Sequence, residues 1–269
     1  MKIKINRADK ILVKWIRNIN KGQYEPLIKV WSGPKNTRRH LLRGFKSERN
    51  HHFLSDGEYR AGIYFESLPT TINYFEQFPL WDIERAIRIA HEMGIKYPQD
   101  KDGEAYVMST DLLCVELDPE TGGLRKISRS YKPLDSFLTK HPVSISRTLD
   151  KLELERRYYE EDGIPFELIT EADISKRCAS NLKACRQAAW YKDEFIAHEE
   201  TFMHVFLEEW FTSPNEIIKV LLEKISRKLG VSYSDCYGLF QWGVWTHQIP
   251  ANLECPINPL RPLIMDEVA

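Results

Sequence analysis

The stretch YVMSTDLLCVELDPETGGLRKISRSYK, residues 106–132, decides the fold that we expect for this chain. Residues 106–117 and residues 124–132 both have the composition of β-strands. The intervening DPETGG contains a proline and two glycines, which suit the turn of a hairpin. Asp111 lies within the first predicted strand and Lys132 ends the second, so a carboxylate and an ammonium are expected on neighbouring strands.

A helix and a third strand are predicted before this hairpin. FLSDGEYRAGIYFES, residues 53–67, opens with Ser55 or Asp56 as its cap and carries Glu58. TINYFEQFPL, residues 71–80, is rich in β-branched and aromatic residues and therefore predicts a strand.

Three further segments complete the predicted sheet domain. WDIERAIRIAHEMG, residues 81–94, and TLDKLELERRYYEEDG, residues 148–163, have the apolar spacing of helices, and each ends in glycine. IPFELIT, residues 164–170, predicts a short buried strand. The order helix, strand, helix, strand, strand, helix, strand predicts an α/β (α+β) domain with a mixed sheet. We place this domain, together with the N-terminal segment, in residues 1–170.

Residues 171–269 predict a second, mainly helical domain. Within it, SPNEIIKVLLEKISRKLG, residues 213–230, predicts a helix that starts with a capping box of Ser213 and Glu216 and ends in glycine. The segment that follows, up to Trp245, is typical of the second half of a helix-turn-helix, and a winged-helix form stays open. A role in reading DNA is the less favoured interpretation, because this half of the chain is not basic.

The tail of the chain has a different character from the helices before it. NLECPINPLRPLIM, residues 252–265, contains three prolines, which resist a regular helix and leave apolar residues on an extended segment. Such a segment either lies along a partner or packs back on its own domain, and the sequence favours neither.

The overall composition is that of a folded protein. The 269 residues are 42% hydrophobic and carry a formal net charge of −1, with no solenoid repeat or low-complexity run. Met1 is followed by lysines rather than by an apolar leader, and no stretch approaches the roughly 18 apolar residues of a membrane span. We therefore expect a cytoplasmic protein without a membrane partner. Five cysteines without a CxxC pair favour reduced thiols over a zinc site.

Positive charge is concentrated near the N-terminus. Residues 1–50 hold 14 Lys or Arg against 3 Asp or Glu. Such asymmetry suggests contact with a polyanion, although basic faces that are merely solvated are common. The basic residues of this segment include Lys2, Lys4, Arg7, Lys10, Lys14, Arg17, Lys35, Arg38, Arg39, Arg43, Lys46 and Arg49.

Glu58, Asp111 and Lys132 have the chemistry of a phosphodiester-hydrolysing site. Hydrolysis needs a cation to neutralise the phosphate, a source of hydroxide and a group that stabilises the leaving oxygen. Mg²⁺ prefers oxygen ligands and is usually held by one or two carboxylates, which Glu58 and Asp111 can supply. Lys132 can orient the attacking water or stabilise charge. On spacing alone, an Asp and a Lys on adjacent strands are more often surface residues of a half-exposed sheet.

Several blocks of the chain, in the same order and spacing, resemble the nuclease domain of the TnsA family, the endonuclease subunit of heteromeric transposases. The blocks are HHFLSDGEYRAGIYFES (51–67), NYFEQFPL (73–80), GIKYP (94–98), VMSTDLL (107–113), YKP (131–133) and LDKLELERRYYEEDGIPFELIT (149–170). The resemblance is close over residues 45–185 and thins toward both ends. It implies a restriction-endonuclease-like fold for the nuclease domain.

The resemblance also implies roles for individual residues. Glu58 in LSDGE, Asp111 in MSTD and Lys132 in YKP match the catalytic residues of the family. Glu58 and Asp111 would ligate Mg²⁺, for which Mn²⁺ would substitute, and the backbone carbonyl of Tyr131 would add a ligand. Ser130 departs from the pattern, since an acid or an amide commonly stands two residues before the lysine. A hydroxyl is a weaker, neutral oxygen ligand, so the role of Ser130 stays open.

By the same resemblance, the chain would cut double-stranded DNA at the 5′ ends of a transposon in a bacterial cytoplasm. Its partners would be the transposase TnsB, which cuts the 3′ ends, and the ATP-dependent regulator TnsC, contacted through the C-terminal domain. Two alternatives stay open. One is a stand-alone restriction or repair nuclease of the same fold, which would cut purified DNA alone. The other is a catalytically inactive DNA-binding adaptor, against which the presence of all three candidate side chains argues.

Overall fold

The computed structural model describes residues 3–33 and 37–266 of the chain. The chain divides into two compact units. The first unit comprises Met1–Gly62 and Thr70–Asp173, and the second comprises Ile63–Pro69 and Ile174–Ala269. The predicted domain boundary after Thr170 falls just before the end of the first unit, and residues 63–69, which we had assigned to the first domain, belong to the second unit.

A four-stranded mixed sheet forms the centre of the first unit. Its strands, in spatial order, are β3 (Thr71–Pro79), β4 (Ser109–Leu117), β5 (Leu124–Tyr131) and β6 (Phe166–Ile169). β4 is antiparallel to β3 and to β5, whereas β5 and β6 are parallel. The predicted mixed sheet is confirmed, and so is the hairpin of β4 and β5, in which Leu113 lies opposite Ser128.

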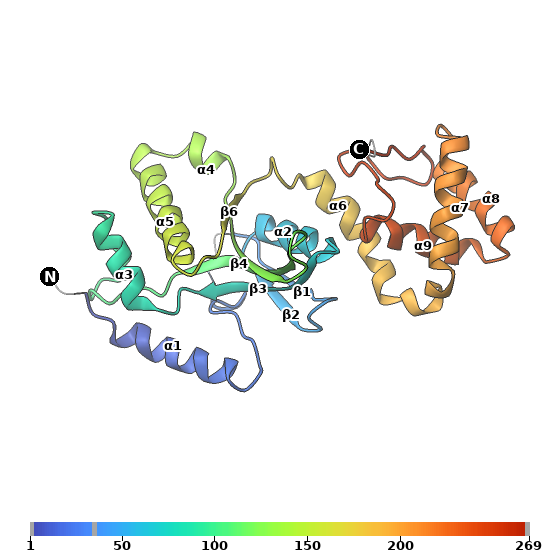
Figure 1. Cartoon of the computed structure of the whole chain (residues 1–269). Helices are drawn as coiled ribbons and strands as arrows, with labels where there is room; N and C mark the ends of the chain where they lie inside the picture. The colour runs from blue at the N-terminus through green and yellow to red at the C-terminus, as the bar shows by residue number, and fades with distance from the viewer. Residues whose placement is uncertain (1–2, 34–36, 267–269) are drawn as a thin grey trace. The chain divides into compact units, whose positions relative to one another are not determined.

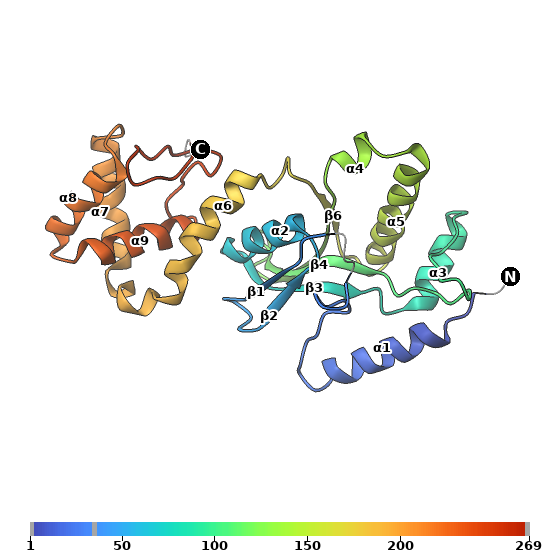
Figure 2. The same cartoon turned by 180° about the vertical axis from the view of Figure 1, so that it is seen from behind.

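Helices and a small antiparallel hairpin accompany this sheet (Figures 1 and 2). The helices are α1 (Asn6–Ile19), α2 (Asp56–Ser67), α3 (Ile83–Glu92), α4 (Asp135–Leu138) and α5 (Pro142–Glu160). The hairpin consists of β1 (His40–Arg43) and β2 (Asn50–Phe53). In both views α5 lies above the strands of the sheet and α1 lies below them.

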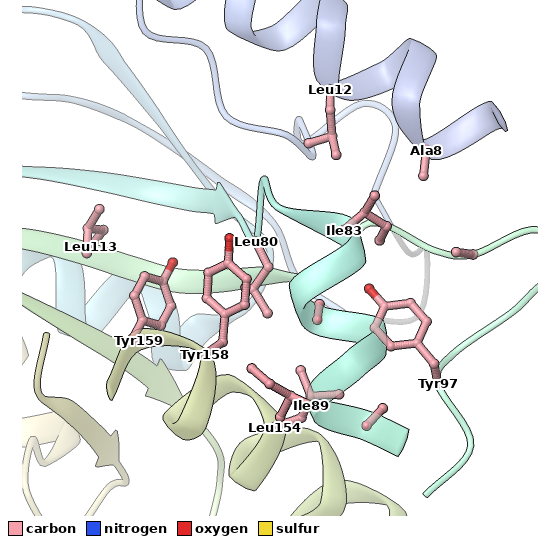
Figure 3. Packing of buried hydrophobic residues seen from close by; sticks show 13 residues of the cluster. Ala8, Leu12, Leu80, Ile83, Ile89, Tyr97, Leu113, Leu154, Tyr158 and Tyr159 are labelled. Atoms are coloured by element: carbon pink, nitrogen blue, oxygen red, sulfur yellow. The ribbon is translucent and has the colours of Figure 1, made fainter. Parts of the chain in front are cut away.

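The apolar faces of α1, α3 and α5 meet in one core (Figure 3). Tyr158 and Tyr159 of α5 lie near Leu80 and Leu113, which come from the end of β3 and from β4. These four side chains are less than 5% exposed. Each such burial stabilises the fold by roughly 1.5–3 kcal/mol, so this core fixes α5 against the strands that carry the site.

Some boundaries differ from the prediction for physical reasons. β6 is not buried: Glu167 and Leu168 are exposed because β6 is an edge strand with a single neighbour. α5 begins at Pro142 rather than at residue 148, because the ring of His141 caps it and proline suits the first helical position. Phe53, which we had assigned to the helix of α2, ends β2 instead.

The second unit is mainly helical. Its helices are α6 (Lys176–Cys185), α7 (Glu199–Thr212), α8 (Ile218–Leu229) and α9 (Tyr233–Trp245), with the short turns η1 (Arg186–Trp190), η2 (Lys192–Glu194) and η3 (Ile196–His198). Phe202, Phe206 and Phe240 are at most 1% exposed and pack ring against ring. The predicted helical character of this part of the chain is confirmed.

The capping box predicted from Ser213 and Glu216 is wrong. Ser213 follows the last residue of α7, and the N–H of Glu216 donates to the Ser213 carbonyl in a turn. α8 begins only at Ile218, and no side chain caps it. The sequence could not show this, because the groups that replace the cap come from a distant part of the chain.

Those groups are carbonyls of the proline-rich tail. The N–H of Ile218 donates to the carbonyl of Arg261 at 3.0 Å, and the N–H of Lys219 donates to that of Pro259 at 2.8 Å. The tail thereby satisfies donors that a helix start leaves unpaired. Leu263 is 3% exposed. The tail therefore packs back on its own unit as a strap.

α8 and α9 form the predicted pair of helices joined by a tight turn. Gly230, with φ of 66°, ends α8 in the left-handed conformation that favours glycine. Within the described residues of the second unit, extended pairing is limited to the isolated bridges Ile217–Pro262 and Ala251–Met265, so no winged-helix hairpin is seen there. None of the helices in the described residues has both the length and the apolar character of a membrane span.

Candidate active site

Glu58 lies on the first turn of α2, where the chain forms a capping box. The hydroxyl of Ser55 accepts the N–H of Glu58 at 3.1 Å and donates to Oε1 of the same residue at 2.9 Å. The N–H of Leu54 donates to Oε2 of Glu58 at 2.8 Å. This S-x-x-E arrangement fixes the start of the helix and the position of the carboxylate together.

Gly57 allows this turn to lie directly against β5. A Cβ at this position would come within 1.8 Å of Cε1 of Tyr131, so any other residue would force the two elements apart. The ring of Tyr131 is held in place from its other end. Its hydroxyl accepts from Nη2 of Arg60 at 2.8 Å and donates to Oε2 of Glu171 at 3.2 Å.

Asp111, Tyr131 and Lys132 are joined by direct hydrogen bonds. Oδ2 of Asp111 accepts the backbone N–H of Tyr131 at 2.8 Å and Nζ of Lys132 at 3.1 Å. Nζ of Lys132 also donates to the carbonyl of Tyr131 at 2.7 Å. The ammonium therefore lies between two of the oxygens that we predicted as metal ligands, and a metal would compete with it for both.

Glu58 joins this group through charge. Burial is the largest influence on its carboxyl and raises the pKa, and the negative charge of Asp111 raises it further. The hydrogen bonds from Leu54 and Ser55 and the charge of Lys132 act in the opposite direction, and the pKa of Glu58 is about 8. Glu58 is 8% exposed, and a buried carboxyl with such a raised pKa is unusual outside functional sites.

Lys132 remains a cation in this setting. Its burial lowers the pKa of the ammonium, but the carboxylates of Asp111, Glu155 and Glu58 outweigh burial and raise that pKa above its usual value. Lys132 therefore donates hydrogen bonds at neutral pH and does not accept a proton.

A further acid, Glu155 of α5, reaches the same place, and our sequence analysis did not include it. The hydroxyl of Ser130 lies 2.8 and 2.9 Å from the two carboxylate oxygens of Glu155. Ser130 is 1% exposed and Glu155 is 4% exposed. Where the resemblance implies an acid or an amide two residues before Lys132, the structure has Ser130, whose hydroxyl donates to Glu155 of the helix.

The electrostatics of Glu155 resemble those of Glu58. Burial is the main cause that raises its pKa, and the charge of Asp111 adds to it. Hydrogen bonds from Thr110 and Ser130 and the charge of Lys132 oppose this rise, and the pKa of Glu155 is about 7.

A signal for Glu155 was present in the sequence. Leu152, Glu155 and Tyr159 follow one another at helical spacing, so a glutamate stands within the apolar stripe of α5. Acids are almost never buried without a partner, and such a residue in an apolar stripe indicates a special environment.

Gln77 is a second residue that the sequence analysis missed. Its Nε2 donates to Oε2 of Glu58 at 3.1 Å, and its Oε1 accepts from the hydroxyl of Ser109 at 3.2 Å. Its backbone has φ of 51°, which is uncommon for a residue other than glycine. Such a conformation within a strand leaves no mark in the sequence.

The chemistry of these side chains suits a hard cation held by oxygen atoms. No group of three or more His, Cys, Asp or Glu side chains in the described residues is placed to hold a metal ion. Mg²⁺ does not need such a cage, since it keeps several waters and is usually held by one or two carboxylates with the substrate. When all of them are ionised, the buried acids exceed the single lysine in charge, and a divalent cation would relieve that excess. Mg²⁺ at this site stays a prediction.

Comparison with known proteins identifies a family for this region. Residues 68–171 match the family model described as "TnsA-like endonuclease N terminal". The chain is 33% identical over 160 residues to the Transposon Tn7 transposition protein TnsA of Escherichia coli, and the aligned part covers 60% of this chain and 55% of that relative. The chain therefore spans about half the length of the relative. The matched segment contains Asp111, Lys132 and Glu155, whereas Glu58 precedes it.

Proposed function

Because the chain belongs to the TnsA family of endonucleases, we propose that it is the Mg²⁺-dependent nuclease subunit of a transposase that hydrolyses the 5′ ends of a transposon. The observation that carries this proposal is that Glu58 of α2, Asp111 of β4, Glu155 of α5 and Lys132, directly after β5, interact electrostatically with one another. Three acids and one lysine that influence one another's charge suit phosphodiester hydrolysis, which needs a cation and a proton acceptor at the phosphate.

The bound cation would neutralise charge on the phosphate and lower the pKa of water. Asp111, Glu58 and the carbonyl of Tyr131 are the oxygens proposed to hold it. For the carbonyl to do so, the ammonium of Lys132 must leave its present hydrogen bond of 2.7 Å. The released ammonium is then placed to donate to the phosphate or to the attacking water.

The proton of that water needs an acceptor, and Glu155 is our candidate. Its pKa of about 7 lies near neutral pH, where a general base is most effective. Lys132 cannot accept this proton, because its neighbouring carboxylates raise the pKa of the ammonium and keep it protonated at neutral pH. We therefore assign proton acceptance to Glu155 and charge stabilisation to Lys132.

The proposed partners are double-stranded DNA at the transposon ends, the transposase TnsB and the ATP-dependent regulator TnsC, in the cytoplasm of a bacterium. We propose that the second unit contacts the regulator. Support for a separate docking role comes from its own aromatic core and from exposed Phe211 and Leu260, at 67% and 68% exposure.

A strand-resolved cleavage assay on transposon-end DNA with Mg²⁺, with and without TnsB, tests the proposal. We expect cutting at the 5′ ends only when both proteins are present, and loss of that cutting in Asp111→Ala and Lys132→Ala. Efficient cutting by the chain alone would indicate a stand-alone nuclease. DNA binding without any cutting would indicate an inactive adaptor.

A matched control separates chemistry from folding in this assay. Glu153 lies on α5 two residues from Glu155, but its carboxylate bonds to Arg156 and Arg157 on the helix surface. Glu153→Gln should cut at the wild-type rate, whereas Glu155→Gln should be strongly impaired. Equal rates for both variants would remove Glu155 from the mechanism.

A further inference from the structure

The outer face of α1 carries a row of basic side chains that the site described above does not use. Lys10, Lys14 and Arg17 follow one another at spacings of four and three residues, which places them on one side of a helix. All three are exposed. Ala8, Leu12 and Trp15, which are at most 9% exposed, lie on the opposite side, in or beside the core.

These three cations, which we call the α1 stripe, have no ion pair or side-chain hydrogen bond with any other residue in the described part of the chain. Several cations elsewhere in the first unit are paired. Arg85 bonds to Asp162 at 2.7 Å, and Arg88 bonds to Glu161 at 2.6 Å. The α1 stripe therefore makes no ion pair that would stabilise the fold, and repulsion between its like charges destabilises the helix slightly.

Not every basic residue near the N-terminus has this character. Arg49 is committed to Glu76, and Arg7 is committed to Asp100, each through an ion pair. Lys2 and Lys35 lie outside the described residues. The charge excess of the first 50 residues thus divides into cations that hold the fold and cations that face solvent.

The stripe is close to the strands that carry the candidate site. Trp15 packs edge to face on Phe78 with ring centroids 5.1 Å apart, and Phe78 pairs with Thr110, the neighbour of Asp111. One helix, about 10–12 Å across with its side chains, therefore separates the stripe from β3 and β4. Figures 1 and 2 show α1 along the outside of the first unit.

We propose that the α1 stripe binds the phosphate backbone of the DNA duplex next to the cleaved bond. From Lys10 to Arg17 the helix rises about 10 Å, and B-DNA carries roughly one charge per 1.7 Å of its axis. Three cations on such a length face several phosphates. This inference rests on the proposed nuclease function, and it adds the surface that would hold the substrate.

Anionic lipid is the competing occupant. Ile11 and Ile16 beside the stripe are 43% and 37% exposed, and basic helices with apolar neighbours can lie on membranes. DNA is favoured because the apolar face of α1 is buried in the protein core, so no wide apolar surface is left to enter a lipid layer.

The test is DNA binding by the full chain without Mg²⁺, measured over a range of salt concentrations. The triple variant Lys10→Ala, Lys14→Ala and Arg17→Ala keeps good helix formers on α1. We expect tenfold to a few hundredfold weaker binding at 0.1 M salt, and a salt slope smaller by about 2–3, since each lost phosphate contact removes about 0.9. The loss should be the same for any duplex sequence, because phosphate contacts carry no base information.

A control variant removes the same charge elsewhere. Lys101, Arg147 and Lys151 are exposed and have no ion pair within the described residues, and Lys101→Ala, Arg147→Ala and Lys151→Ala should change binding and slope much less. Equal losses in both triple variants, or an unchanged slope in the α1 variant, would overturn the proposal. Preferential binding of wild-type chain to phosphatidylserine vesicles, lost in the α1 variant while DNA binding persists, would assign the stripe to lipid.

The same proteins separate this inference from the nuclease proposal. If the wild-type chain cuts transposon ends but the α1 variant binds DNA normally, the proposed role of the α1 stripe is contradicted and the proposed nuclease function is supported. If the α1 variant loses DNA binding but the wild-type chain cuts no DNA with any partner, the role of the α1 stripe is supported and the proposed nuclease function is contradicted.

Discussion

Two of the groups of charged residues around buried acids in the first unit differ in how their charge is compensated. Glu76, on β3, is fully buried and accepts two hydrogen bonds from Arg49, at 2.8 and 2.6 Å. It also accepts from Nδ1 of His51 at 2.8 Å and from the N–H of His52 at 3.1 Å. Burial alone would raise its pKa, but the hydrogen bonds and charges of His51 and Arg49 bring the pKa of Glu76 to about 2.

Glu58 and Glu155 are buried to a similar degree, yet burial together with the charge of Asp111 raises their pKa values to about 8 and about 7. Lys132 is the cation that opposes this rise for both. Burial is common to the two groups, so it cannot explain the difference. The Glu76 group (Glu76, Arg49 and His51) is complete within the protein. Full ionisation of the Asp111 group (Asp111, Glu58, Glu155 and Lys132) would leave an excess of negative charge, as expected where a cation binds.

The largest effect should come from removing the charge of Asp111, which acts on Lys132 and on the two buried glutamates of the Asp111 group. Asp111→Asn should lower the rate of 5′-end cleavage by about 10³-fold or more, because it removes a proposed ligand and the partner of Lys132. The same change should stabilise the metal-free fold, since Glu58 and Glu155 lose a like charge. Cleavage rates and thermal melting in the absence of Mg²⁺ measure the two effects.

An exposed residue serves as the control for this change. Asp102→Asn, at an exposed position in a loop, should alter neither the rate nor the melting temperature. A metal-free Asp111→Asn protein that melts below wild type would show that the site is not strained by charge.

The complete group should respond in the opposite way. Glu76→Gln leaves Arg49 and His51 without their carboxylate and should lower the free energy of unfolding by about 3 kcal/mol. Denaturant unfolding would measure it, with Glu160→Gln as the comparison, since Glu160 pairs with Arg156 on the exposed surface of α5 and should cost less than about 1 kcal/mol. A cost for Glu76→Gln as small as that of Glu160→Gln would contradict the assignment of Glu76 to stability.

The two groups should also give opposite dependences of stability on pH. The pKa of Glu58 rises from the usual 4.5 to about 8, so the folded state holds a proton that the unfolded state releases between these values. The stability of the metal-free protein should therefore fall by on the order of 2 kcal/mol as pH rises from about 5 to 8. The pKa of Glu76 is lowered to about 2, so its contribution is present above 4.5 and is lost as pH falls toward 2.

Unfolding measured from pH 3 to 9, for wild type and for Asp111→Asn, separates these contributions. The fall toward pH 8 should be smaller in the variant, because part of the rise in pKa at Glu58 and Glu155 comes from Asp111. A profile that is flat between pH 5 and 8 in wild type would contradict the raised pKa values.

The smallest effect is expected at Ser130. Ser130→Ala removes the hydroxyl that donates to Glu155, a loss of about 1 kcal/mol in stability, and should slow cleavage less than about tenfold. The carboxylate of Glu155 remains, which is the reason for the modest change. A loss as complete as that of Asp111→Asn in the same cleavage assay would make Ser130 a ligand in its own right.

Sequence reasoning located the part of this site that is local. Asp111 and Lys132 lie on the two strands of one hairpin, so their proximity follows from strand pattern and turn residues alone. The position of Glu58 came from resemblance to a family and from the capping residues before it. The structure brings these residues together, and their catalytic roles stay predictions.

The remainder depends on contacts that are distant along the chain. Glu155 approaches Ser130 only because α5 packs across the strands, and the sequence showed no more than an acid in an apolar stripe. Gln77 reaches Glu58 through an unusual backbone conformation. The start of α8 is set by tail carbonyls, which local capping patterns cannot anticipate. Local propensity is overridden in each case by tertiary contacts.

The release of protons on Mg²⁺ binding tests most directly whether the Asp111 group is a site completed by a cation. Carboxyls must ionise to hold a metal, and Glu58 and Glu155, with pKa values of about 8 and 7, retain protons at neutral pH. Calorimetric titration at pH 7 in buffers of different ionisation enthalpy should therefore show release of about one proton per bound ion. The release should be largely lost in Glu58→Gln with Glu155→Gln. Mg²⁺ binding without proton release in wild type, or the same release in the double variant, would contradict the account.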